Sequence, residues 1–208
     1  MTVRVEFFFD LSSPWTRLAF ANIRPALDGL DYSIAWRPFL VGGVFNAVNP
    51  SVYESRKPEN AARLARSFGW LKQWAELAGV GMNFPSEHHP LKSVNAMRFC
   101  CALEEEQEAL ERFALAAFEA YFTHARNLDD PAVLVAVANE AGLGGAALAE
   151  RAGSQPVKDR LRANTDEAIA RGAFGSPTIF VHDPTGEEQL YFGNDQLPLV
   201  RAKVAALA

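Results

Sequence analysis

The chain has 208 residues, of which 49% are apolar, and this is enough for one large domain or for a domain that carries a second one. Its net charge is −5 and its Lys and Arg residues form no basic stripe, so we expect a small-molecule partner rather than nucleic acid or an anionic membrane surface. The N-terminus turns polar at Asp10 and no apolar run approaches the ~20 residues of a membrane span, which predicts a cytoplasmic protein.

The first part of the chain has the pattern of a strand, a helix and a second strand. Apolar residues alternate over residues 3–9, with one well-buried face and a second that is partly buried. Residues 15–27 carry apolar positions at helical spacing, and residues 32–39 are rich in aromatic and β-branched side chains. A unit of this kind should cross over right-handed and pair its strands in parallel.

The middle of the chain is predicted to be helical, after a connecting segment. Residues 41–50 are rich in Gly, Asn and Pro without periodicity, so we expect a loop or a linker there. Helical spacing then continues to about Arg171. Within it, residues 91–108 are apolar on most faces at first and become acidic at 104–106, which predicts a buried helix that emerges into water.

The strand period returns near the C-terminus. Residues 178–181 and 189–192 flank a turn and predict a β-hairpin, which a final amphipathic helix follows. Each β-containing end is too small to bury a core alone, so we expect both to share one sheet. This βαβ…ββα order predicts an α/β, thioredoxin-like domain formed by residues 1–45 and 173–208, with residues 46–172 as a large all-helical insertion.

The cysteines and histidines limit the redox and metal chemistry that can be expected. Cys100 and Cys101 are adjacent in a predicted helix, where neighbouring side chains point in different directions, so we expect no disulfide. None of the four histidines stands at metal-ligand spacing with Cys, Asp or Glu, and we predict no metal site.

The junction Ser13-Pro14, between the first strand and the first helix, is the first candidate site. Taken alone, such a pair is usually an N-cap followed by a favourable first residue of a helix. A second stretch near the other end of the chain, Phe174-Gly175-Ser176-Pro177-Thr178, favours a functional interpretation of both.

These two stretches, together with Asn49-Pro50, residues 71–75 and Gly193-Asn194-Asp195, resemble the family of 2-hydroxychromene-2-carboxylate isomerases. That family is a branch of the DsbA-like thioredoxin superfamily, which also includes the kappa-class glutathione transferases. The matching stretches span nearly the whole chain in the right order. The resemblance implies a DsbA-like thioredoxin fold, glutathione as the cofactor and a homodimer.

The resemblance also shows what is missing from the turn. Disulfide oxidoreductases of this superfamily carry a Cys-x-x-Cys pair there, whereas this chain reads Ser13-Pro14-Trp15-Thr16, so dithiol exchange cannot occur. A helix N-terminus and a hydroxyl donor remain, and both favour an anion. We therefore expect Ser13 to be the catalytic residue, holding the sulfur of glutathione as a thiolate.

Family resemblance assigns the other contacts with glutathione. Ser176-Pro177 resembles a cis-proline turn that pairs with the cysteinyl part, while Asn194 and Asp195 would meet the γ-glutamyl end. Asp195 could equally be only an N-cap and Asn49 only a turn residue. The expected cofactor-binding residues are Ser13, Pro14, Asn49, Ser176, Pro177, Asn194 and Asp195.

The substrate side is less defined. Aromatic residues could wall a substrate pocket, although at helical spacing they are more often core: Trp15, Phe39, Phe45, Trp70 and Trp74. Lys92 or Arg98 would hold a substrate carboxylate. Lys92 stands where members of the family usually have Asn, which leaves the substrate open.

The predicted function is a glutathione-dependent cis/trans isomerisation of a conjugated aromatic α-keto acid, of the 2-hydroxychromene-2-carboxylate or trans-o-hydroxybenzylidenepyruvate type, in aromatic hydrocarbon catabolism. Two alternatives stay open at this point: a kappa-class-like glutathione transferase or peroxidase, and a non-catalytic thioredoxin-like binding protein.

Overall fold

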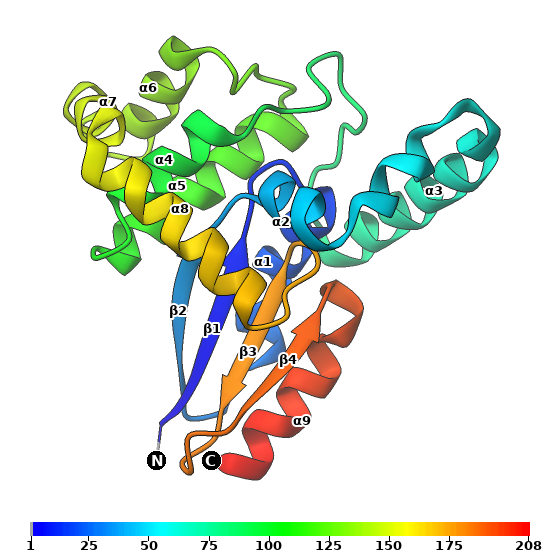
Figure 1. The fold of residues 1–208 in the computed structure, drawn as a ribbon, viewed down its shortest axis with the longest axis vertical. Coiled ribbons are helices and arrows are strands. Elements are labelled where there is room, and N and C mark those ends of the chain that lie inside the picture. The colour runs from blue at the N-terminus through cyan, green and yellow to red at the C-terminus, as the bar shows by residue number, and fades with distance from the viewer. Residues whose placement is uncertain (1) are drawn as a thin grey trace.

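The computed structural model describes residues 2–208, with residues 55 and 56 by their backbone alone. Both ends of the chain contribute to one four-stranded sheet of order β2-β1-β3-β4 (Figure 1). Its strands are β1 (Val3–Phe9), β2 (Tyr32–Pro38), β3 (Thr178–His182) and β4 (Glu188–Phe192). β1 pairs in parallel with β2 and antiparallel with β3, which pairs antiparallel with β4. The predicted shared sheet and hairpin are therefore confirmed.

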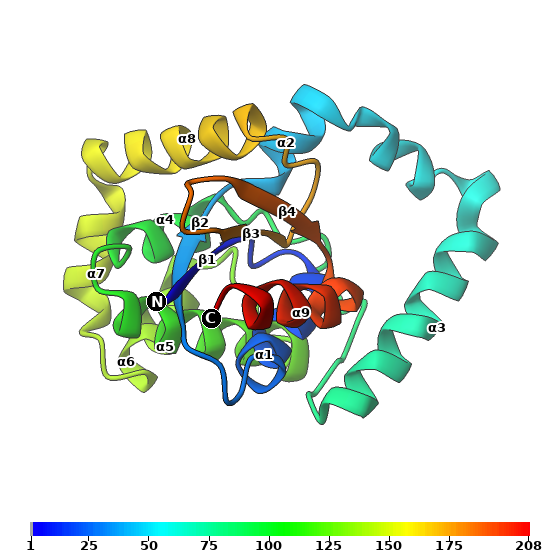
Figure 2. The same cartoon turned by 90° about the horizontal axis from the view of Figure 1, so that it is seen from below.

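Helices cover both faces of this sheet. α1 (Pro14–Ala26) and α9 (Leu197–Leu207) lie on one face, and α8 (Gln155–Ala170) lies on the other (Figure 2). The predicted insertion, residues 46–172, contains α8 and also α3 (Ala61–Ala78), α4 (Val94–Ala102), α5 (Gln107–Phe118), α6 (Pro131–Glu140) and α7 (Gly145–Gly153). α2 (Val41–Val48) precedes them along the chain. Shorter turns are η1 (Pro50–Arg56), η2 (Pro58–Asn60), η4 (Asn194–Gln196) and the π-helical η3 (Glu119–Thr123). No helix in the described part of the chain is both long enough and apolar enough to cross a membrane.

The prediction of a loop over residues 41–50 is wrong, because α2 occupies most of it. Val41 and Val44 of α2 are buried, and a Cβ at Gly43 would come within 2.9 Å of the Thr165 side chain on α8. Gly43 therefore permits the close approach of the two helices, and tertiary packing outweighs the low helix propensity of the Gly pair. α2 also crosses the predicted boundary between residues 45 and 46, and the division into 1–45, 46–172 and 173–208 stays a prediction.

The two faces of the sheet have different interiors. On the α1 side, Phe7 and Phe9 of β1 meet Phe20 of α1 and Trp36 of β2, and the rings of Phe20 and Trp36 stack with centroids 4.1 Å apart. On the α8 side, Phe8 packs edge-on against Phe39 and Phe180. The expectation of one buried and one partly buried face is confirmed, and α8 makes the second face an interior as well.

Glu104 corrects the prediction that residues 91–108 form one helix emerging into water. The helix ends at Ala102, and α5 begins at Gln107. Glu105 and Glu106 are exposed as expected, but Glu104 is only 8% exposed. Arg37 and Asn164 both donate to its carboxylate. Burial raises the pKa of Glu104, and these partners oppose that rise.

Candidate functional site

Ser13 begins α1 at the end of the sheet where β1 stops. Its backbone is extended, its Oγ accepts a hydrogen bond from the Thr16 N–H at 3.2 Å, and Pro14 is the first helical residue. The predicted cap is present. The positive end of the α1 dipole therefore lies beside the Ser13 hydroxyl, as an anion site requires.

Asp10 fixes the turn that carries Ser13. Its carboxylate is fully buried and accepts hydrogen bonds from the backbone N–H and hydroxyl of Ser12, both at 2.8 Å. It also accepts from the Val41 N–H at the start of α2 and from the Ser93 hydroxyl just before α4. Burial raises the pKa of Asp10, and these hydrogen bonds oppose that rise. Asp10 thus joins the turn to the start of α2 and to the segment before α4.

Ser176-Pro177 approaches the same turn from the other end of the chain, and its peptide bond is cis as expected. The Ser13 hydroxyl donates to the Ser176 carbonyl at 3.1 Å. The Ser176 hydroxyl accepts from the Asp10 N–H at 3.0 Å and lies 2.8 Å from Thr16 Oγ1. The structure therefore brings together the two stretches that the sequence singled out.

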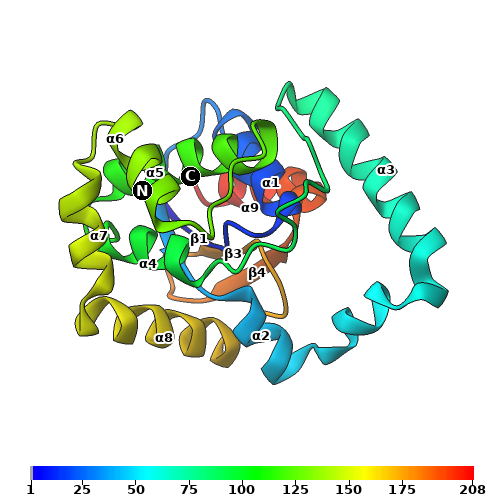
Figure 3. The same ribbon diagram turned by 90° about the horizontal axis from the view of Figure 1, so that it is seen from above.

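A cavity of about 520 Å³ opens over this junction. The segment from α2 through η1 and η2 to α3 runs as an arc beside the end of the sheet (Figure 3), and its residues form part of the cavity wall. The lining is mostly apolar and aromatic, as is usual for small-molecule sites. The described lining residues are Ser12, Ser13, Pro14, Trp15, Val41, Phe45, Val52, Leu64, Ser67, Phe68, Phe84, Pro85, His89, Pro90 and Ser176.

The remaining expected glutathione contacts do not line the cavity. Pro177 is buried behind Ser176. The Asn49 side chain, at the end of α2, donates to the Phe174 carbonyl at 3.1 Å and so ties the arc to the cis-proline loop. Asn194 is buried and its Oδ1 accepts from Asn22 of α1 at 2.8 Å, whereas Asp195 is exposed in η4.

Several expected substrate contacts lie elsewhere. Trp15 and Phe45 line the cavity, but Phe39 is 0% exposed in the core against Phe8. Trp70 and Trp74 of α3 are 54% and 38% exposed, so they are neither cavity wall nor core.

The two candidate cations are also outside the cavity lining. Lys92 is exposed, and only its backbone N–H is fixed, by Asp129. Arg98 lies half-buried on α4, where its Nη1 is 3.4 Å from Asn95 Oδ1. Neither residue is among the described residues that line the cavity over Ser13, and their predicted contact with substrate stays a prediction.

Sequence reasoning missed the cavity wall that follows α3. Phe84, Pro85, His89 and Pro90 reach the cavity from the irregular segment between α3 and α4. Such a segment has no periodicity from which its direction could be inferred. The helical spacing of Leu64 and Leu71 predicts that Ser67 lies on the same face of α3. Nothing in the sequence indicated that Ser67 would be a polar residue in the cavity wall.

Neither thiol of the chain lines the cavity. Cys100 and Cys101 are buried in α4 and form no disulfide, as predicted. Burial raises the pKa of both thiols well above its ordinary range. The chain therefore supplies no reactive thiolate at the turn.

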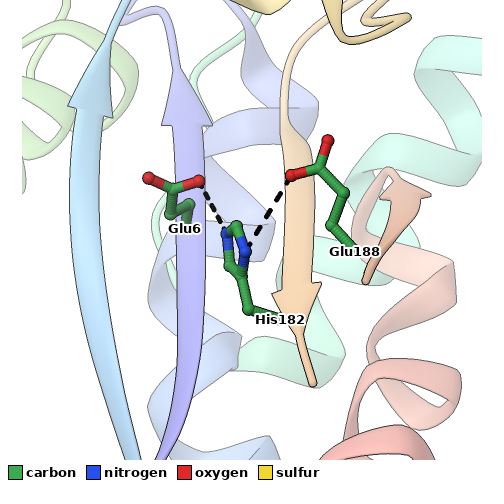
Figure 4. A group of neighbouring side chains, drawn as sticks. All are labelled: Glu6, His182 and Glu188. Atoms are coloured by element: carbon green, nitrogen blue, oxygen red, sulfur yellow. Dashed lines mark hydrogen bonds and ion pairs between the residues drawn. The ribbon is translucent and has the colours of Figure 1, made fainter. Parts of the chain in front are cut away.

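A second polar cluster lies on the face of the sheet that α8 covers, opposite the face that α1 covers (Figure 2). Figure 4 shows the His182 ring of β3 between the carboxylates of Glu6 on β1 and Glu188 on β4. The three ligand atoms lie within 4.8 Å of one another, a juxtaposition that the sequence spacing did not predict. Arg171, however, donates to Glu6 at 2.6 Å and to Glu188 at 2.7 Å.

The charges of this cluster are thus already balanced by cations of the chain. Arg37 donates to Glu6 at 3.0 Å and also pairs with Glu167. Burial by itself raises the pKa of Glu6, but hydrogen bonds from Arg171 and His182 outweigh it and lower that pKa to about 2. We interpret the cluster as a structural ion-pair network that holds α8 against the sheet.

Known proteins resemble this chain in sequence and in fold. The profile of the DSBA-like thioredoxin domain matches residues 4–205. Glutathione S-transferase kappa 1 of Rattus norvegicus is 27% identical over 201 residues, which cover 94% of this chain and 88% of that protein. The 2-hydroxychromene-2-carboxylate isomerase of Sphingobium xenophagum is 27% identical over 203 residues, which cover 97% and 98%.

The solved structures extend the same likeness to three dimensions. A selenomethionine structure of 2-hydroxychromene-2-carboxylate isomerase aligns with a TM-score of 0.78 at 22% identity, over 98% of this chain and 95% of that one, and so shares its fold. Because the family profile extends over nearly the entire sequence, this chain belongs to the DSBA-like thioredoxin domain family.

Proposed function

We propose that this protein binds glutathione at the start of α1 and isomerises a conjugated aromatic α-keto acid, as an enzyme of aromatic hydrocarbon catabolism. The observation that carries the proposal is the Ser13 hydroxyl at the N-terminus of α1, opposite the cis Ser176-Pro177 peptide in a cavity of about 520 Å³. The name of the kappa transferase supports the use of glutathione, and the name of the isomerase supports the reaction.

The residues present suit a thiolate. The described cavity lining contains no carboxylate, and Asp10 behind the turn already accepts four hydrogen bonds. At the turn itself, the donors are the Ser13 hydroxyl and the end of α1. A negative charge placed there is attracted by the helix dipole, without repulsion from an exposed acidic group.

When bound, glutathione would supply a thiolate nucleophile able to add reversibly to the conjugated carbon; the former double bond could rotate in the enolate, and collapse of the enolate would return the double bond and the thiolate. Ser13 would stabilise that sulfur before addition and after elimination. Its hydroxyl proton now points to the Ser176 carbonyl, and rotation about the Cβ–Oγ bond can transfer the hydrogen bond to the sulfur. Trp15, Phe45 and Phe68 would hold the aromatic ring.

The peptide part of glutathione would extend along residues that surround the turn. Ser176 and Pro177 would pair with the cysteinyl backbone, with Pro14 beneath it and Asn49 beside it. Asn194 and Asp195 would meet the γ-glutamyl end, since a carboxylate suits Asn194 near a helix start and an ammonium group suits Asp195.

Ser13→Ala is the direct test. Without the hydroxyl, the pKa of bound glutathione should rise and turnover of a benzylidenepyruvate should fall at least about tenfold, the effect of a lost hydrogen bond to a developing charge. The ultraviolet absorbance of the thiolate, recorded during a pH titration of the complex, reports the pKa separately from the rate.

Ser154→Ala is the matched control, because Ser154 is also the residue before a helix but lies at α8, away from the cavity. It should change neither quantity. Normal glutathione binding with unchanged turnover in Ser13→Ala would exclude the proposed role of the hydroxyl. Failure of the unmodified protein to bind glutathione in calorimetry would exclude the function and favour a non-catalytic binding protein.

A kappa-class-like transferase or peroxidase is the second candidate, and the kappa-class relative favours it. It would use the same thiolate but consume glutathione instead of returning it. Free thiol measured before and after complete turnover separates the two, because an isomerase leaves the thiol concentration unchanged. The homodimer and the cytoplasmic location that the resemblance and composition suggest stay predictions, of which light scattering tests the first.

A further inference from the structure

The polar groups of the cavity form two separate sets. Ser12, Ser13 and Ser176 lie at the start of α1, where the sulfur is proposed to bind. Ser67 and His89 line the cavity from α3 and from the segment that follows it. Among the lining residues whose side chains the structure describes, His89 is the only ionisable one.

His89 is held in place by its surroundings. Its ring packs edge-on against Phe84, with centroids 4.6 Å apart. Phe84 is itself buried against Phe68 and Phe122. The carbonyl of the preceding residue, His88, accepts a hydrogen bond from the Tyr121 hydroxyl at 3.1 Å. The imidazole is thus a pre-positioned polar group rather than a mobile surface side chain.

An acidic substrate would need such a group. A conjugated aryl keto acid has an apolar ring, an electrophilic carbon and a carboxylate, and burying the carboxylate without a donor is costly. Lys92 and Arg98, the cations expected for this role, lie outside the described lining. Imidazole offers an N–H donor in either protonation state, and protonation adds a positive charge.

We propose that His89 recognises the carboxylate of the second substrate and makes the cavity selective for arylalkyl carboxylates over neutral aryl compounds of the same shape. This rests on the proposed function, because the sulfur must occupy the start of α1 for the carboxylate to be directed to the other polar set. His89 is then a specificity-determining residue, and the apolar wall between the two sets holds the ring.

Binding of two unreactive probes tests this without relying on turnover. Phenylbutyrate carries the carboxylate, and phenylbutanol replaces it with a hydroxyl on the same skeleton. With saturating glutathione present, calorimetry should show phenylbutyrate binding at least about tenfold more tightly than phenylbutanol, the factor expected from a charge-assisted hydrogen bond. His89→Phe keeps an aromatic ring against Phe84 and should abolish this preference, while phenylbutanol affinity changes by less than about threefold.

His88→Phe is the matched control, because His88 is adjacent in sequence and does not line the cavity. It should retain the preference for the acid, whereas His89→Gln, which keeps an N–H donor, should retain part of it. An unmodified protein that binds both probes equally, or a His89→Phe variant that keeps the preference, would overturn the proposal. Glutathione affinity, measured without either probe, tests the proposed function independently. The preference for phenylbutyrate over phenylbutanol can also be measured without glutathione.

Discussion

The cavity over Ser13 and the charged cluster under α8 both bring polar groups together, but the hydrogen bonds of these groups differ. In the cluster, Glu6 is 2% exposed and its carboxylate is bonded to Arg37, Arg171 and His182. In the cavity, the Ser13 hydroxyl donates to a single carbonyl and faces open space. A ligand at the cluster would have to break several ion pairs, whereas a ligand over Ser13 needs to replace one neutral hydrogen bond.

This difference separates stability from function. Fully paired charges in a low-dielectric interior fix one arrangement and are costly to disturb. Hydroxyls beside a helix N-terminus can exchange partners at little cost, which a catalytic group requires. Mutations in the cluster should therefore change the free energy of unfolding. Mutations in the cavity should change ligand affinity and reaction rate.

Glu6→Gln should produce the largest change in stability. It removes the more buried of the two anions that Arg37 and Arg171 share and leaves them only Glu167 in common. Removal of one partner from a buried network typically costs about 3 kcal/mol. Urea unfolding followed by circular dichroism measures the free energy of unfolding. Glu105→Gln is the control, because Glu105 is exposed and its pair with Arg160 should contribute less than about 1 kcal/mol. A loss below that value in Glu6→Gln would show that the network is not structural.

Acid should weaken the same network in the unmodified protein. The folded-state pKa of Glu6 is about 2, below its ordinary value of 4.5. Its contribution is therefore complete above the unfolded pKa of 4.5 and is lost as the pH falls toward 2. After allowance for screening by solvent at the arginines, this is about 2 kcal/mol.

Asp10 and Glu104 have raised pKa values and act in the opposite sense, since protonation favours their folded state. The quantity to measure is therefore the difference in unfolding free energy between the unmodified protein and Glu6→Gln, at a series of pH values. That difference should shrink as the pH falls from 5 to 2. A constant difference would contradict the assigned pKa of Glu6.

Ser13→Ala should affect stability much less than activity. The substitution removes the side-chain acceptor for the Thr16 N–H, and loss of such a cap costs about 1 kcal/mol. The folded structure should survive, so thermal unfolding and circular dichroism will show whether the loss of turnover reflects chemistry. A destabilisation above about 3 kcal/mol would show that Ser13 is mainly a structural residue, like those of the charged cluster.

The strands and the first helix could be predicted because their burial follows a local period. Alternation in β1 and the hairpin of β3 and β4 is visible without knowledge of the partners. That Ser13 meets Ser176, 163 positions later, came only from the family resemblance. Local patterns contain no information about which distant turns share one end of a sheet.

The features that the sequence did not predict have the same physical origin. Glu104 was expected in water because its partner Arg37 is 67 positions away, and the approach of Glu6 to His182 joins residues 176 apart. His89 lies in a segment without periodicity, and α2 contains two glycines that disfavour a helix. In each case a tertiary contact determines the structure, and the local sequence pattern either predicts something else or predicts nothing.

α2 connects the cavity with the charged cluster, so substitutions in it test whether the two regions are coupled. Its first N–H binds Asp10 beside the cavity, and its Gly43 approaches Thr165 of α8, which covers the cluster. The Thr165 hydroxyl accepts from the Leu40 N–H and donates to the Leu161 carbonyl, so the side chain cannot turn away freely. Gly43→Ala should therefore destabilise the protein by about 1 to 2 kcal/mol through overpacking.

Gly42→Ala is its matched opposite. A Cβ at Gly42 meets nothing within 4 Å, so alanine should stabilise the helix by roughly 0.5 to 1 kcal/mol through propensity alone. Urea unfolding of both variants should give changes of opposite sign. Equal stabilisation by both would mean that α2 and α8 are not in close contact, and that the cavity wall and the cover of the cluster move independently of each other.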